Sequence, residues 1–474
     1  MKIFKNFIGL AAIALCLGFA SCSSDDDAPS YSNVAVSNSE LMTILKAKGY
    51  QFDENGKMLL DDKANSTTSL DLSGTKVDTA ALKELSVFPN LKELNLSSNG
   101  YGPVFHIASL PSQITGLDLQ GNDIYDFDGL VTAKVENDEV KATILHEFTK
   151  LYLPASCKYN VEDLMPFYTQ NEAENKTVDM QMVNAKGSLE KYNTLREIPD
   201  EYFRAYLKQK FASLFTDDTH IDISKPMKNS EQGESIHLWY SSQYENIDKI
   251  NSIEGVEYFV NNPYYQDFYV SIGYTKHYTI GYIMPGANIK GLQFTNISTP
   301  NGVDLTKAKN LATVTFGNDD YLTSLDLSNT VVANQQLDDI DATVSNMLEI
   351  TNCKNLSSLM LPKNPIGIIG TVLLSNLPSL NNVDLSSIKA ISTLCIFQMP
   401  NASIKYPALT NVYYTAKNTL EELASKKHKI SFCLSKNVFE KSETQNFITS
   451  YKASLRDRYY SYEEYDSFPW SENI

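Results

Sequence analysis

The sequence predicts a mixed α/β fold built as a solenoid, in which each coil of the chain supplies one short strand and one return segment. The clearest coil is LKELNLSSNGY, residues 91–101. Leucines occupy its first, fourth and sixth positions, Asn99 its ninth and Tyr101 its eleventh, which is the pattern of a repeat solenoid. Because side chains alternate along a strand, Leu94 and Leu96 point to one side and Asn95 to the other.

The same template recurs before and after this coil at a regular spacing. Thr75 takes the asparagine position in the preceding coil, and Asn122 takes it in the following one. The central leucines Leu70, Leu94 and Leu117 are 24 and 23 residues apart. This lies inside the range of about 20 to 29 expected for one strand and one return segment. Regular matches of this kind predict a repeat rather than isolated surface strands.

The asparagine position has a physical reason. After the strand the backbone turns sharply and its amides lose their ladder partners, so a buried Asn99 side chain, which both donates and accepts, can satisfy them. The motif resembles the leucine-rich repeats of BspA-like and internalin-like surface proteins. This resemblance implies a leucine-rich repeat solenoid with irregular coils, and it says more about fold than about ligand.

Residues 1–21 have the composition of an export signal. Lys2 and Lys5 precede an apolar run of about 13 residues, short of the roughly 20 that span a membrane. Ala-Ser followed by Cys22 resembles the cleavage and acylation site of bacterial lipoproteins, although Phe19 stands where that family usually has Leu. The resemblance implies a lipid anchor on Cys22 in the outer membrane. Plain secretory cleavage is the alternative.

Residues 22–36 form an acidic, serine-containing tether. Its Ser-Ser-Asp-Asp-Asp stretch resembles the surface-export tag of Bacteroidetes lipoproteins, which implies exposure at the cell surface; a solvated spacer fits the same composition. The formal charge of −17 becomes −19 when Lys2 and Lys5 leave with residues 1–21. Such a charge argues against nucleic acid or anionic lipid as a partner.

The remaining cysteines show no metal-ligand spacing. Cys157, Cys353, Cys395 and Cys433 lie far apart, so we expect buried small hydrophobes, and a disulfide between two of them stays open. The acidic turn that starts at Asp53 resembles the first half of a calcium loop but lacks the closing Glu. We expect no metal and no cofactor.

The mature chain is expected to contain two arms, each opened by a helical cap. Residues 37–170 form the first arm, whose short first helix Ser37 or Ser39 is expected to cap. The polar residues 171–196 are expected to be a linker. Residues 197–435 form the second arm, because Ile198-Pro199-Asp200 resembles the cap that precedes leucine-rich repeats in Bacteroidetes surface proteins. Residues 436–474 are expected to be an aromatic tail.

The second arm is less regular than the first. Its candidate strand centres are Leu292, Val314, Leu325, Leu359, Val383 and Val412. Two of these marks stand 11 residues apart between Leu311 and Val332, which predicts coils with strands on both faces. A closing helix is expected at residues 419–427.

No catalytic motif is present in the sequence. There is no nucleophile elbow, no His-Glu-x-x-His, no phosphate loop and no paired cysteine motif, and the histidines are isolated from one another. We therefore expect a binding protein and not an enzyme, since solenoids usually offer extended binding surfaces.

Two groups of residues are candidates for ligand contact. The residues expected to face outward on the first arm are Lys92, Glu93, Asn95, Thr115, Asp118, Gln120 and Tyr152. The second group is rich in tyrosine, a residue that suits sugars and proteins alike when exposed; its central members are Tyr264, Tyr265 and Tyr269, and the alternative is that many of these rings belong to the core. The sequence thus predicts a surface lipoprotein that binds a protein or glycoprotein in adhesion or host interaction. The alternative is a lipoprotein that captures polysaccharide, a glycan ligand, for nutrient uptake.

Overall fold

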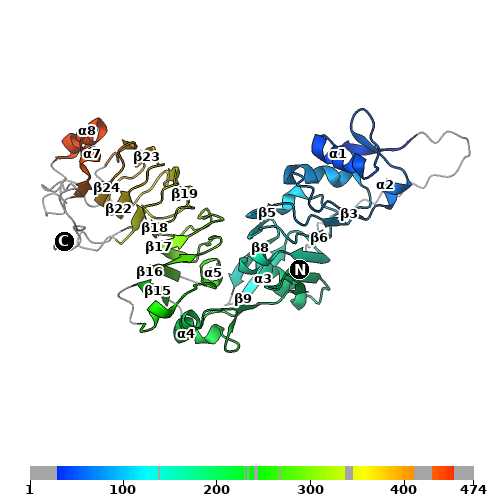
Figure 1. Ribbon diagram of the computed structural model, residues 1–474, viewed down its shortest axis with the longest axis horizontal. Coiled ribbons are helices and arrows are strands. Elements are labelled where there is room, and N and C mark those ends of the chain that lie inside the picture. The colour runs from blue at the N-terminus through cyan, green and yellow to red at the C-terminus, as the bar shows by residue number, and fades with distance from the viewer. Residues whose placement is uncertain are drawn as a thin grey trace, which may run out of the picture.

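The computed structural model describes residues 29–452, apart from residues 137–138, 229, 232–233, 240–243, 266–267, 337–344 and 410–429; of residues 274–275 it describes the backbone alone. The expected signal, Cys22, the strand at Val412, the helix at residues 419–427 and most of the tail lie outside these residues. Figure 1 shows two elongated halves that meet near the middle of the chain and enclose an open angle.

A small helical unit begins the first half. Its elements are β1 (Tyr31–Ala35), α1 (Ser39–Ala47), β2 (Lys57–Leu59), which pairs with β1, and α2 (Asp62–Ser66). The N-cap of α1 is Asn38, and not Ser37 or Ser39 as expected, because Asn38 Oδ1 accepts a hydrogen bond from Leu41 N at 2.9 Å. A short side-chain amide reaches the free N–H groups of the first helical turn as well as a hydroxyl does.

The first sheet has six strands, of which five are parallel and follow one another in chain order across the sheet. They are β3 (Ser69–Asp71), β4 (Glu93–Asn95), β6 (Gly116–Asp118), β10 (Lys150–Leu153), β11 (Asp179–Val183) and the antiparallel β12 (Leu189–Lys191). Leu70, Leu94, Leu117 and Leu151 lie side by side in register and are buried. The expected leucine positions therefore form one row of the core.

Return segments cover the other side of this core. They are η1 (Thr79–Val87), β5 (Val104–His106), η2 (Ile107–Ser109), β7 (Asp126–Asp128), η3 (Ala155–Tyr159) and α3 (Leu164–Ala173). An inserted hairpin, β8 (Val131–Glu136) and β9 (Glu139–Ile144), interrupts the series and contacts α3. This hairpin contains the charged residues from Lys134 to Lys141.

Asn99 and Asn122 satisfy the backbone of the turns, as expected. Asn99 Nδ2 donates to Leu72 O at 3.1 Å and to Leu96 O at 2.9 Å, and Asn99 Oδ1 accepts from Lys76 N at 2.7 Å. Asn122 Oδ1 in turn accepts from Asn99 N at 2.9 Å. Each asparagine therefore joins its own coil to the coil before it.

The stretch expected to be a linker, residues 171–196, is part of the fold. It contains the end of α3 and strands β11 and β12, which extend the first sheet. Tyr192 and Arg196 are buried, and Arg196 donates to Lys158 O at 2.9 Å and to the Tyr192 hydroxyl at 3.0 Å. The polar composition misled the prediction because β11 is half-exposed at the edge of the core, where alternate polar residues are tolerated.

A second helical unit opens the second half. Its elements are β13 (Leu195–Glu197), α4 (Glu201–Lys210), η4 (Ala212–Leu214), β14 (His220–Asp222), η5 (Ile247–Lys249) and α5 (Glu257–Val260). Asp200 caps α4, since its Oδ1 accepts from Tyr202 N and Phe203 N. Its Oδ2 accepts from Asn251 N at 2.9 Å, so the same carboxylate also holds the following coil.

The second sheet has eight parallel strands, again in chain order. They are β15 (Ser235–Trp239), β16 (Phe268–Thr279), β17 (Ile289–Ser298), β18 (Thr313–Gly317), β20 (Met347–Thr351), β22 (Ile369–Ser375), β24 (Ile391–Phe397) and β26 (Ser431–Leu434). Leu292 and Val314 are buried centres of β17 and β18, as expected. The strands β15, β16, β20, β22, β24 and β26 were not predicted.

Short strands also pair on the other side of this core. They are β19 (Ser324–Asp326) with β21 (Ser358–Met360), and β23 (Asn382–Asp384) with β25 (Ser403–Lys405). The expected centres Leu325, Leu359 and Val383 lie in these strands, so the coils carry strands on both faces. The helices α7 (Lys436–Phe439) and α8 (Ser442–Tyr451) follow β26.

A row of amide side chains runs along the ends of the second sheet's strands. Asn318, Asn352 and Asn376 each directly follow a strand, Asn296 lies near the end of β17, and all four have φ between 51° and 60°. Asn318 Nδ2 donates to Asn296 Oδ1, Asn352 Nδ2 to Asn318 Oδ1 and Asn376 Nδ2 to Asn352 Oδ1, at 2.7 to 2.9 Å. Asparagine suits this place because it tolerates the left-handed region better than other side chains do.

The two halves of the chain pack against each other. Val161 and Met165 belong to the core of the second half, whereas Leu164 and Phe167 on the same segment belong to the core of the first. Lys307 Nζ lies 3.3 Å from Asp126 Oδ2 and 2.8 Å from Glu162 Oε2. The expectation of two arms separated by a linker is therefore wrong in this respect.

Candidate binding faces

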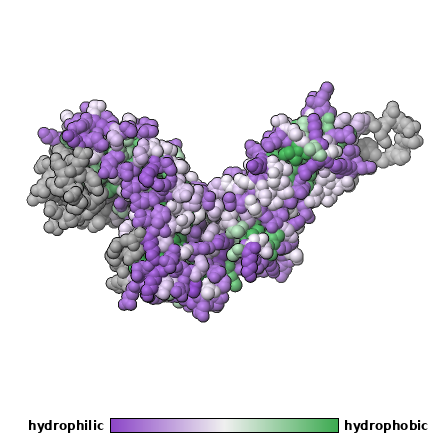
Figure 2. All heavy atoms as spheres, viewed as in Figure 1, coloured by the Kyte–Doolittle hydropathy of each residue, from purple (hydrophilic) through white to green (hydrophobic). Residues whose placement is uncertain are grey.

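The outward side chains of β3, β4, β6, β10 and β11 form a surface that we name the charged face. Its members are Ser69, Asp71, Glu93, Asn95, Gly116, Asp118, Lys150, Tyr152, Asp179 and Gln181. They alternate along each strand with the buried residues of the core, which fixes their direction. Figure 2 shows that the visible surface of this half is mostly hydrophilic, with a few small hydrophobic areas.

Ionic and hydrogen-bond contacts cross the charged face from strand to strand. Lys150 Nζ lies 3.0 Å from Glu93 Oε2 and 4.9 Å from the centre of the Tyr152 ring. The Glu93 side chain reaches Lys150 across Gly116, where an added Cβ would lie 2.6 Å from Glu93 Cγ. The Tyr152 hydroxyl donates to Asp179 Oδ2 at 2.7 Å, and this bond raises the pKa of the phenol. These contacts order the side chains before any ligand arrives.

The structure brings the residues predicted for the first arm together. Glu93, Asn95, Asp118 and Tyr152 lie on the charged face itself. Lys92 and Thr115 stand just before their strands, and Gln120, just after β6, donates to both carboxylate oxygens of Asp118.

Sequence reasoning missed Lys150, Asp179, Gln181 and Asp71. Lys150 was detectable, because it stands two residues before Tyr152 on the same strand and therefore shares its direction. Asp179 and Gln181 were hidden because their strand lies in the stretch expected to be a linker.

The tyrosine group predicted for the second arm is divided by the fold. Tyr265 is 1% exposed and packs in the core beside Phe259, so it cannot contact a ligand as expected. Tyr264 is half-buried and its hydroxyl donates to Glu162 O at 2.8 Å, across the junction of the halves. Tyr269 is 43% exposed. The difference arises from direction, because Tyr269 stands between the inward-facing Phe268 and Val270 on β16.

The outward side chains of β15 to β18 form a second surface, which we name the neutral face. Its members are Ser235, His237, Trp239, Tyr269, Ser271, Gly273, Gly291, Gln293, Thr295, Thr313, Thr315 and Gly317. None is Asp, Glu, Lys or Arg. Burial and, secondly, Lys210 lower the pKa of His237, which favours its neutral form. The charged face therefore carries Asp, Glu and Lys side chains, whereas the neutral face carries none of these.

A polar row crosses the neutral face at right angles to the strands. Trp239 Nε1 donates to Ser271 Oγ, and Ser271 Oγ donates to Gln293 Oε1 at 3.0 Å. Thr315 follows in register; it is 4% exposed, and its hydroxyl has no hydrogen-bond partner in the described part of the chain. Glu349 on β20 is next, and burial raises the pKa of its carboxyl.

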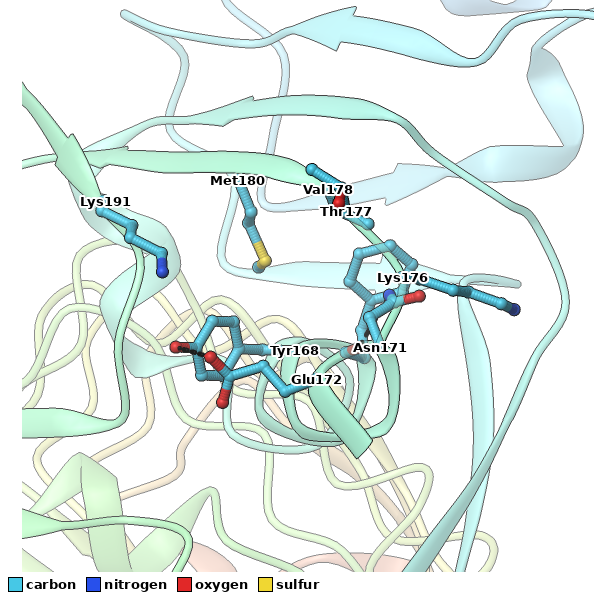
Figure 3. A pocket seen from close by; sticks show the side chains of 9 residues that line it. Tyr168, Asn171, Glu172, Lys176, Thr177, Val178, Met180 and Lys191 are labelled. Carbon is cyan, nitrogen blue, oxygen red and sulfur yellow. Dashed lines mark hydrogen bonds between the residues drawn. The ribbon is translucent and has the colours of Figure 1, made fainter. Parts of the chain in front are cut away.

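A small pocket lies between α3 and strands β11 and β12. It has a volume of about 220 Å³ and is lined by Phe167, Tyr168, Asn171, Glu172, Lys176, Thr177, Val178, Met180 and Lys191. Figure 3 shows Met180 and Lys191 directed toward this space and Lys176 directed away from it. The Tyr168 hydroxyl donates to Glu172 Oε1 at 2.6 Å at one side. The pocket was not foreseen, because it depends on the unpredicted strands β11 and β12.

Other chemically active side chains are dispersed. Cys157, Cys353, Cys395 and Cys433 are buried thiols; Cys395 and Cys433 are in register on neighbouring strands. Within the described ranges, no group of three or more His, Cys, Asp or Glu is arranged to hold a metal ion.

No family model, curated protein or solved structure matches the chain. In the part of the chain that the structure describes, no helix is both long enough and apolar enough to cross a membrane.

Proposed function

We propose that the chain is a leucine-rich repeat lipoprotein, anchored through Cys22 at the outer surface of the cell, that binds a protein or glycoprotein. The single observation that supports this ligand class best is the charged face. It carries ordered carboxylates, an ammonium group and a phenol within one sheet, a mixture that complements a protein surface of patterned charge.

The repeat assignment is supported by the order of the strands. Successive strands add to one edge of a parallel sheet, their leucines stack in register, and Asn99 and Asn122 join neighbouring coils. Because each coil contacts mainly its neighbours, the arrangement exposes a long, ordered surface without needing an enclosed site. The anchor rests on the sequence around Cys22 alone.

The test measures binding of the soluble ectodomain, from Ser30 onward, to a panel of extracellular-matrix and mucin proteins, each before and after enzymatic deglycosylation. Charge reversal at Glu93→Lys together with Asp118→Lys should weaken binding at least about tenfold, since both side chains lie in the middle of the charged face. The matched control is Glu139→Lys, an exposed position on the hairpin.

The interaction should also weaken as salt is raised, because exposed charges are screened. Equal loss in the reversal and control variants would contradict the proposal, as would binding that disappears with the glycans. Capture of a polysaccharide is the alternative function, and the neutral face is the observation that favours it.

A further inference from the structure

We propose that the neutral face is a separate binding site for an uncharged pyranose glycan. The neutral face differs from the rest of the chain in its charge. The chain has a formal net charge of −17, yet none of the twelve members of the neutral face carries a formal charge; Lys276 on β16 and Lys290 on β17 lie outside this set. An anionic polymer is recognised largely through positively charged side chains, which this face lacks. A surface of hydroxyl, amide and aromatic groups fits an uncharged, hydroxyl-rich ligand.

The aromatic rings of Trp239 and Tyr269 each lie over a neighbouring strand. A Cβ added at Gly291 would lie 2.2 Å from Tyr269 Cδ1, and one added at Gly273 would lie 2.5 Å from Trp239 Cη2. Both rings therefore lie across a glycine of the next strand, with one side against the backbone. The indole is held there by its hydrogen bond to Ser271. The other side of each ring faces outward, where the C–H face of a pyranose packs well because the ring is apolar.

Hydrogen-bonding side chains lie between and beside the two rings. The Thr315 hydroxyl is buried without a partner in the described residues, which is unfavourable, and a ligand reaches it once a neighbouring side chain of the row moves aside. Gln293 accepts from Ser271 and keeps its amide N–H groups for further bonds. Glu349, in register with Thr315 on β20, adds carboxyl acceptor atoms at the end of the row. Sugar hydroxyls donate and accept, so they match each of these groups.

The spacing of the rings indicates a chain of sugars. Tyr269 is in register with Ser235, four residues before Trp239 on the neighbouring strand, which places the backbone positions of the two residues about 13 Å apart along the strands. An oligosaccharide lying along the strand direction can contact both rings. Anionic glycans are disfavoured, because the face has no cation to pair with them and Glu349 lies at its border.

The experiment uses the ectodomain from Ser30 onward and compares neutral gluco- and manno-oligosaccharides with heparin and polygalacturonate. The chain has two tryptophans, so Trp470→Phe leaves Trp239 as the reporter in fluorescence titrations. A neutral oligosaccharide should change the Trp239 emission saturably. Trp239→Ala and Tyr269→Ala should each weaken retention in glycan-affinity gels at least about tenfold. The control is Tyr321→Ala, an aromatic side chain that is 56% exposed outside the neutral face.

A further variant separates binding from folding. Thr315→Val keeps the side-chain shape but removes the hydroxyl without a partner, so it should weaken glycan binding while thermal stability stays equal or rises. Absence of binding by every neutral glycan, preference for the anionic ones, or equal binding by Tyr269→Ala and Tyr321→Ala would overturn the proposal. Glu93→Lys on the charged face should leave glycan binding unchanged, which keeps this result independent of the protein ligand.

Discussion

Replacing Asn99 by Ala removes four side-chain hydrogen bonds from the turn that follows β4, three of them to the backbone. The backbone groups are Lys76 N, Leu72 O and Leu96 O, so the substitution affects this coil and the coil before it. Leu72 O keeps a bond from Thr75 Oγ1 and Leu96 O keeps one from Asn122 Nδ2, whereas Lys76 N loses its side-chain partner.

The lost hydrogen bonds lower the free energy of unfolding. A typical intramolecular hydrogen bond contributes about 0.5–1.5 kcal/mol, and only Lys76 N is left without its side-chain partner, so the loss should lower the free energy of unfolding by about 2–4 kcal/mol. This is large beside the roughly 5–15 kcal/mol that stabilises a typical domain. The Asn99→Ala variant should therefore open the first sheet locally well before the second half is affected, because each coil depends on its neighbours.

Amide hydrogen exchange on the intact ectodomain measures this opening coil by coil, which suits a chain too large for two-state unfolding. Protection of the amides in β3, β4 and β6 should fall about 100-fold or more. The control is Asn95→Ala, an outward residue whose side chain accepts one bond, from Ser97 N at 3.0 Å. Equal exchange in the two variants would refute the role assigned to Asn99.

Two other results are expected. Burial raises the pKa of the Glu257 carboxyl to about 7 from its ordinary 4.5. The unfolded chain therefore releases this proton at a lower pH than the folded chain does. As a result, the native state loses stability as pH rises from about 4.5 to about 7. Glu257→Gln should gain about 2.5 kcal/mol relative to the unmodified protein between pH 5 and pH 8, measured by urea unfolding; parallel pH curves would show that the buried carboxyl does not titrate in this range. Cys22→Ala should release the protein from the membrane fraction of cells, because acyl chains provide the proposed anchor, and retention of the variant in that fraction would remove the basis for the anchor.

The sequence determined those features that depend on short-range pattern. Leu94, Leu96 and Asn99 have to recur at fixed spacing because each fills the same place in every coil, so their roles were readable from one coil alone. The direction of Glu93, Asn95, Asp118 and Tyr152 followed from strand alternation for the same reason. The cap at Asp200 was readable because a Pro-Asp pair before a helical period is a local signal.

Other features depended on partners distant in the chain. Tyr265 and Tyr269 are four residues apart and chemically identical, yet one is core and the other surface, because β16 and the segment before it face different neighbours. Residues 171–196 have the composition of a linker, and the pairing of β11 with the edge of β10 makes them part of the first sheet.

The amide row and the neutral face depend on register above all. Asn296 and Asn318 are ordinary loop residues in sequence, and Trp239, Gln293 and Thr315 stand on separate coils; stacking parallel strands in register brings each set together. Side-chain periodicity along the chain specifies which way a residue points, whereas only the packing of whole coils decides which residues become neighbours across the sheet.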